Sequence, residues 1–174
     1  LESGTLYLED GQTSNVSNAL ISIPYERGKP VVADVSATVS GAASAIASIA
    51  GRNPVNAMKN APFTATDLSG DATVTLKAQF PLKKDVQANE VAWSADIGLN
   101  GVSVAKPFDG QQLTDASGNI SANKRGFELK ADARLNGLPA KLSLKQSLGD
   151  AIADRTLSVQ LELNEKARST LAPG

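Results

Sequence analysis

Two stretches near the middle of the chain alternate strictly between apolar and polar residues. In residues 71–80 the even positions are apolar and the odd positions polar, and residues 91–99 alternate in the same way, with Trp93 at an apolar position. Side chains of a β-strand point alternately to opposite faces, so each stretch predicts a strand with one apolar and one polar face. The polar segment between them contains Pro81, which predicts a connection and an antiparallel pair.

Similar alternation predicts strands along most of the remaining chain. They are expected at residues 4–11, 18–25, 31–40, 116–123, 127–135, 138–145 and 157–163. Gly101 stands where the alternation changes phase, which is typical of a β-bulge. Asn136 and Gly137 form a strong hairpin signal because both residues tolerate the positive φ angles of a tight turn.

The alternation stops at Gly41, and residues 42–50 are rich in Ala, which has the highest helix propensity. We expect a helix there, with Ser40 as its N-cap and Gly51 as the residue that ends it. Its apolar stripe is predicted to consist of Ala42, Ala45, Ile46 and Ile49. Further short helical segments are expected at residues 53–60 and 164–171.

The predicted fold class is therefore mainly β, as a long antiparallel, curved and groove-like sheet with one or two short helices. Residues 1–174 are expected to be a single β-rich segment of a larger protein, with a helical insertion at about residues 41–60. A sandwich of two sheets is the alternative, because two one-sided sheets packed face to face also form an ordinary core.

Composition excludes several classes of function. The 174 residues carry a net charge of −1 without a basic block, and only 4% are aromatic, so no nucleic-acid partner is expected. The chain has neither His nor Cys, which excludes a Ser-His-Asp or Cys-His mechanism and an imidazole or thiolate metal site. We predict no enzymatic activity, no cofactor and no metal.

Acidic residues occur with Gly in residues 67–71 and 109–119, but neither stretch has the spacing of a calcium-binding EF-hand loop. Ordinary turn chemistry is the favoured interpretation of both. A pair of carboxylates for glycoside hydrolysis stays open as an alternative, because the sequence does not show which acids meet in space.

The apolar faces of the central and later strands supply a candidate lipid-binding surface. The predicted groove-lining residues are Val74, Leu76, Trp93, Ile97, Leu99, Phe127, Leu129, Leu142 and Leu144. For each of them, and for the aromatic Trp93 and Phe127 above all, packing in a closed core is the competing interpretation.

An ordered set of short motifs within roughly residues 31–145 resembles the AsmA-like envelope proteins, in particular the YhdP-like group with its domain of unknown function. The motifs are Ala61-Pro-Phe, Leu68-Ser-Gly-Asp-Ala, Phe80-Pro-Leu, Leu99-Asn-Gly-Val, Gly110-Gln-Gln-Leu, Ala116-Ser-Gly-Asn-Ile and Ala133-Arg-Leu-Asn-Gly-Leu-Pro-Ala-Lys. The resemblance implies a periplasmic β-groove in a protein anchored to the inner membrane of a Gram-negative bacterium. It further implies that phospholipid acyl chains are shielded in this groove between the inner and outer membranes.

Two functions from different classes follow. The first is lipid binding and transport, with phospholipid acyl chains and neighbouring segments of the same longer chain as partners. The second is a structural spacer or protein-interaction module built on a β-sandwich. Because the chain lacks an initiator Met, we expect a piece of a longer protein, and an isolated piece with an open apolar face is expected to be prone to self-association.

Overall fold

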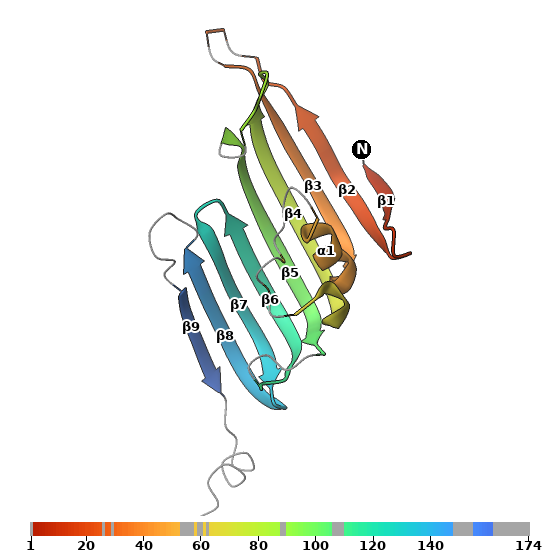
Figure 1. Ribbon diagram of the computed structural model, residues 1–174, viewed down its shortest axis with the longest axis vertical. Coiled ribbons are helices and arrows are strands. Elements are labelled where there is room, and N and C mark those ends of the chain that lie inside the picture. The colour runs from red at the N-terminus through yellow and green to blue at the C-terminus, as the bar shows by residue number, and fades with distance from the viewer. Residues whose placement is uncertain are drawn as a thin grey trace, which may run out of the picture.

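The computed structural model describes residues 2–25, 27–28, 30–52, 58, 61, 63–87, 90–105, 110–147 and 155–161. Nine strands form one antiparallel sheet in which each strand pairs with the next along the chain (Figure 1). They are β1 Ser3–Tyr7, β2 Thr13–Ser22, β3 Val32–Ala42, β4 Leu68–Pro81, β5 Ala92–Val104, β6 Leu113–Asn123, β7 Gly126–Leu135, β8 Leu138–Ser147 and β9 Arg155–Leu161. The mainly β fold class is confirmed, and the described residues form one sheet rather than the two of a sandwich.

The pairing register places the apolar positions of neighbouring strands opposite one another. Val74 of β4 lies opposite both Val39 of β3 and Ile97 of β5. Because the same alternation continues from strand to strand, the apolar positions share one side of the sheet, which we call the apolar face. The other side carries mostly Ser, Thr, Asn, Asp and Lys, and we call it the polar face.

Bulges keep this separation of faces intact where the sequence changes phase. The register shifts in β2, β5 and β6, and Asn18, Gly101 and Asp115 at these shifts have φ angles of 52°, 61° and 55°. The N–H of Gly101 donates to Oγ of Ser117 at 3.0 Å, and the N–H of Asp115 donates to Oγ of Ser103 at 3.0 Å. The predicted bulge at Gly101 is confirmed, and serines on adjacent strands satisfy the amides that two of the bulges free.

One helix packs on the apolar face and contacts a 3-10 turn. Helix α1 (Ala43–Ala50) contacts β2, β3 and β4 and the turn η1 (Ala65–Asp67), and in Figure 1 it lies in front of the sheet. The side chains of Ala43, Ala45, Ile46 and Ala47 are buried. Within the described residues, no helix has the length and apolar composition needed to cross a bilayer.

The predicted helix ends are wrong in detail. Ser40 lies inside β3, where it pairs with Thr73 of β4. The N-cap is Ala42, which makes no side-chain capping bond. Strand β3 runs directly into α1, so no residue is left between them to act as a polar cap. Gly51 follows the helix with a right-handed φ of −75°, not the left-handed conformation expected of a terminating glycine.

The predicted apolar stripe of the helix is also partly wrong. Ala42 is exposed, whereas Ala43 and Ala47 are buried beside Ala45 and Ile46. The helix begins one residue later than predicted, and at 3.6 residues per turn its orientation on the sheet brings in a neighbouring row of side chains.

Other predicted boundaries differ by a few residues. Strand β2 begins five residues earlier than predicted and β6 three residues earlier, and η1 was not predicted. The hairpin at Asn136 and Gly137 is confirmed, with φ angles of 51° and 80°. The helical segments predicted at 53–60 and 164–171 lie outside the described residues, apart from Met58.

Candidate functional site

A row of aliphatic side chains crosses eight strands of the apolar face. In register order the row consists of Val16, Val39, Val74, Ile97, Ile120, Leu129, Leu144 and Leu157. Since neighbouring strands lie about 4.8 Å apart, this aliphatic row extends about 34 Å across the sheet, perpendicular to the strands. No charged side chain interrupts it.

The nine predicted groove-lining residues all lie on the apolar face. Val74, Ile97, Leu129 and Leu144 belong to the aliphatic row. Leu99 and Leu142 lie one pair closer to α1, and Leu76, Trp93 and Phe127 lie on the opposite side of the row. The structure brings these residues onto one surface, and their binding role stays a prediction.

Helix α1 covers one end of the apolar face, where the strands carry small residues. Ser14, Gly41 and Ala72 lie opposite one another on β2, β3 and β4, the three strands that α1 contacts. Ala72 is buried in one cluster with Ala43 and Ile46 of α1. We call this part the covered half; its sheet residues also include Leu99, Val102, Ala116 and Ala133.

Ser14 is a buried polar residue in the covered half. Its side chain is 2% exposed, and its hydroxyl has no hydrogen-bond partner among the described residues. A Cβ placed on Gly41 would lie 3.2 Å from that hydroxyl oxygen. The sequence did not reveal Ser14, Gly41 and Ala72 as the small-residue seat on which α1 packs. These three small residues are seen to lie side by side only once the register of three strands is known.

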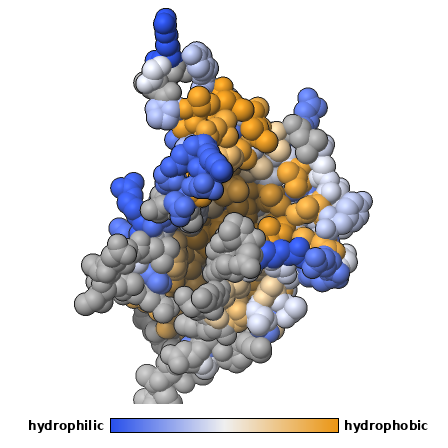
Figure 2. All heavy atoms as spheres, turned by 45° about the horizontal axis from the view of Figure 1, so that its top comes forward, coloured by the Kyte–Doolittle hydropathy of each residue, from blue (hydrophilic) through white to orange (hydrophobic). Residues whose placement is uncertain are grey.

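The opposite end of the apolar face is left uncovered by the described residues. Leu76 is 38% exposed, Trp93 36% and Ile21 71%. We call this part the open half; its residues are Ile21, Val35, Leu76, Ala78, Trp93, Ala95 and Phe127. Figure 2 shows hydrophobic residues gathered over a hollowed surface, with hydrophilic residues at its borders.

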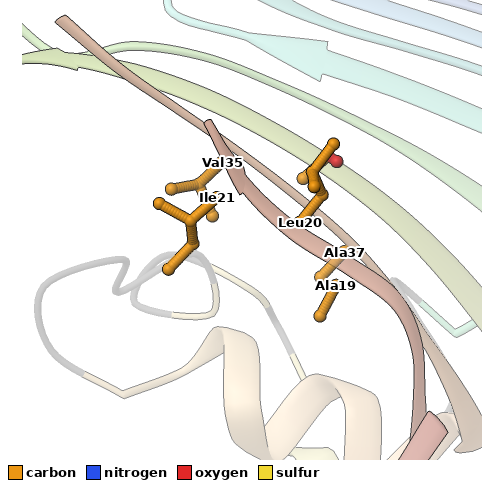
Figure 3. Close-up of a pocket in the computed structure, with 6 residues that line it drawn as sticks. Ala19, Leu20, Ile21, Val35 and Ala37 are labelled. Atoms are coloured by element: carbon orange, nitrogen blue, oxygen red, sulfur yellow. The ribbon is translucent and has the colours of Figure 1, made fainter. Parts of the chain in front are cut away.

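The described residues also form two shallow, open hollows near β2. One, of about 400 Å³, lies beside the bulge at Asn18, where Leu20 points away from Ile21 and Val35 (Figure 3). The other, of about 540 Å³, is lined mostly by polar-face residues of β2 to β5. Of the nine predicted residues, only Trp93 lines either of these two hollows.

The described parts of three connections beside the open half carry an excess of basic residues. The described parts of the β2–β3, β4–β5 and β6–β7 connections contain five basic and two acidic side chains, which are Arg27, Lys83, Lys84, Lys124 and Arg125 against Asp85 and Glu90. We call these five cations the basic rim. At the other end of the sheet, the described connections carry three acids against one base, namely Glu9, Asp10 and Asp67 against Arg52.

Glu90 joins two of the connections in the rim. Nζ of Lys83 lies 2.5 Å from Oε1 of Glu90, and the N–H of Gln87 donates to Oε2 at 2.9 Å. The hydrogen bond from Lys83 and then that from Gln87 lower the pKa of Glu90, and the charge of Lys124 lowers it further. The β6–β7 hairpin tip therefore lies close enough to the β4–β5 connection for their charges to interact.

Charges on the polar face pair with one another. Nζ of Lys130 lies 2.7 Å from Oε1 of Glu128, whose pKa this contact lowers, and Nε of Arg134 lies 3.6 Å from Oδ2 of Asp115. Among the described residues, no group of three or more acidic side chains is placed to hold a metal ion.

Comparison of the chain with protein-family models, with curated proteins and with solved structures finds no match.

Proposed function

We propose that this chain is a non-enzymatic lipid-binding and transport segment, which shields phospholipid acyl chains on the apolar face of its sheet. The observation that carries the proposal is the aliphatic row, which crosses eight strands beside an open half that the described residues leave uncovered. The AsmA-like resemblance of the sequence gives this activity a setting. In this setting the chain is part of a protein anchored in the inner membrane of a Gram-negative bacterium, and the groove of that protein crosses the periplasm toward the outer membrane.

The hydrophobic effect supplies the driving force. Burial of apolar area is favourable by about 25 cal/mol per Å², or about 0.8 kcal/mol for each methylene group. Soluble monomeric proteins rarely leave large contiguous apolar patches in water, and such patches commonly mark binding sites. An acyl chain laid on the open half removes apolar surface of both protein and lipid from water, and no bond needs to form or break.

The side chains of the aliphatic row determine how selective the surface is for acyl chains. The row consists of Val, Ile and Leu, which offer no hydrogen bond that would distinguish one hydrocarbon chain from another. A hydrophobic pocket discriminates by only about 1–3 kcal/mol per methylene. We therefore expect low selectivity for the acyl chain and continuation of the groove in neighbouring segments of the same longer protein.

Native mass spectrometry of the purified chain, with lipid extraction from the same sample, tests the proposal. We expect phospholipid to co-purify at a defined stoichiometry. Leu76→Glu and Leu157→Glu each place a charge on the apolar face at a side chain that already reaches water, and we expect both to reduce the bound lipid several-fold. Ser158→Glu is the matched control, because Ser158 is exposed on the polar face next to Leu157.

A lipid-free monomer that also fails to bind hydrophobic dyes would contradict the proposal. The structural spacer or protein-interaction module would then become the better account of the apolar face. Equal lipid loss in Ser158→Glu would show that any added charge on the sheet disturbs binding, and would remove the assignment to the apolar face.

A further inference from the structure

The polarity of the sheet changes in a regular order along β4 and β5. From the covered half toward the connection, the pairs on the apolar face are Ala72 with Leu99, Val74 with Ile97, Leu76 with Ala95, and Ala78 with Trp93. Beyond them come the basic rim residues Lys83 and Lys84. The surface therefore passes from a helix-covered floor through exposed hydrocarbon to an indole and then to cations.

The length of the partly exposed hydrocarbon on β4 matches one lipid chain. From Val74 to Ala78 is four residues, or about 14 Å at about 3.4 Å per residue of antiparallel strand. The hydrocarbon core of a bilayer is about 30 Å thick, so a chain in one leaflet spans about 15 Å. An acyl chain lying along the strands therefore reaches from the edge of the covered half to Trp93.

Trp93 marks the boundary between the two environments. It is the single Trp of the chain, is 36% exposed, and lies one pair from the end of the β4–β5 ladder. Trp is enriched where an apolar environment meets water, because its ring is largely apolar and its N–H donates a hydrogen bond. Its place between Leu76 and the basic rim corresponds to the level where hydrocarbon meets headgroup.

The geometry points to a headgroup site for anionic phospholipid at the basic rim, with the acyl chains running along the strands toward α1. The described connections beside the open half carry five cations against two acids, which supplies the charge complementarity, whereas the described connections at the opposite end carry three acids against one base. The inference rests on the proposed function, which it deepens by naming the headgroup and the orientation of the lipid.

Binding of phosphatidylglycerol and phosphatidylcholine of identical acyl chains, at low salt, tests the headgroup. Each basic residue near an anionic lipid contributes about fivefold in affinity. We expect phosphatidylglycerol to bind at least tenfold more tightly, and the variant Lys84→Gln/Lys124→Gln/Arg125→Gln to lose this preference while still binding phosphatidylcholine. The matched control is Lys77→Gln/Lys141→Gln/Lys145→Gln, which removes the same charge from the polar face.

Quenching of Trp93 fluorescence tests the orientation. Phosphatidylglycerol brominated near the carboxyl end of its acyl chains is expected to quench Trp93 more strongly than lipid brominated near the terminal methyl groups. The reverse order, or equal quenching, would overturn the inferred orientation.

The remaining outcomes separate the two claims. Tight binding of both lipids without a headgroup preference, or loss of the preference in the polar-face control, would overturn the headgroup site and leave the proposed function standing. Competition by inorganic phosphate as effective as that by phosphatidylglycerol would reassign the rim to a free anion. If neither lipid binds, both proposals are overturned.

Discussion

The covered and open halves of the apolar face use the same strands in opposite ways. In the covered half, Ala43 and Ile46 of α1 pack against strand residues that include Ala72, Val102 and Ala116. In the open half the strand residues include Leu76 and Trp93, which stay more than one-third exposed. The difference shows that strand alternation alone does not decide burial. Burial also requires a partner, and the described chain supplies one for only half of the face.

Truncation of Ile46 is expected to cause the largest loss of stability. Ile46 is 8% exposed at the centre of the contact between α1 and the sheet, so Ile46→Ala leaves a cavity. We expect the free energy of unfolding to fall by about 2–4 kcal/mol in urea denaturation. Leu76→Ala is expected to cost less than about 1.5 kcal/mol, because its side chain is already partly in water. Equal losses would mean that the open half is as well packed as the covered half.

Substitution of Gly118 tests how closely β6 and β7 approach each other next to the bulge in β6. A Cβ there would lie 2.2 Å from the carbonyl oxygen of Lys130 and 2.5 Å from Cα of Ala131, so Gly118→Ala must push β6 and β7 apart. We expect a loss of about 1–3 kcal/mol of unfolding free energy. Gly98→Ala is the control, since its Cβ would meet nothing closer than 3.8 Å. A neutral Gly118→Ala would show that the two strands are not held this close.

Substitutions of two serines test the hydrogen bonding in and around the covered half. The hydroxyl of Ser14 is buried and has no hydrogen-bond partner in the part of the chain that the structure describes, so Ser14→Ala is expected to raise the free energy of unfolding by about 1 kcal/mol. Oγ of Ser44 donates to Oε1 of Gln12 at 2.9 Å, so Ser44→Ala is expected to lower it by about 1 kcal/mol. Opposite signs in thermal or urea unfolding would support the packing described, and a loss for Ser14→Ala would show that its hydroxyl is paired.

The smallest expected effect concerns Glu90 in the basic rim. Its pKa is lowered in the folded chain, first by the hydrogen bond from Lys83, so ionised Glu90 adds stability above its unfolded pKa. That contribution disappears as the pH falls through the lowered folded pKa. In NMR titration we expect Lys83→Gln to raise the pKa of Glu90 and to leave that of Glu128, which Lys130 lowers, unchanged. An unchanged pKa of Glu90 would show that the contact with Lys83 does not persist in solution.

Local patterns predicted the strands well because alternation and turn chemistry depend on neighbouring residues. The long strands around Val74 and Ile97, the bulge at Gly101 and the Asn136–Gly137 hairpin were all evident in the sequence. The N-cap at Ser40 was wrong, because pairing of β3 with β4 extends past that residue.

The functional surface was only partly predictable. The apolar positions that became the aliphatic row could be named strand by strand, but their alignment depends on the register and on bulges at Asn18 and Asp115 that were not predicted. The small-residue seat of α1 and the basic rim also require strand order, since their residues are far apart in sequence and meet only in the folded sheet.

Photocrosslinking at two adjacent positions tests whether phospholipid binds the apolar face and not the polar face. A benzoylphenylalanine replaces Leu76 on the open half or Lys77 on the polar face of the same strand, in the protein as it is expressed in the cell. The account predicts that the probe at position 76 forms an adduct with phospholipid and that the probe at position 77 does not. A protein adduct without lipid at position 76, or no adduct at either position, would contradict it.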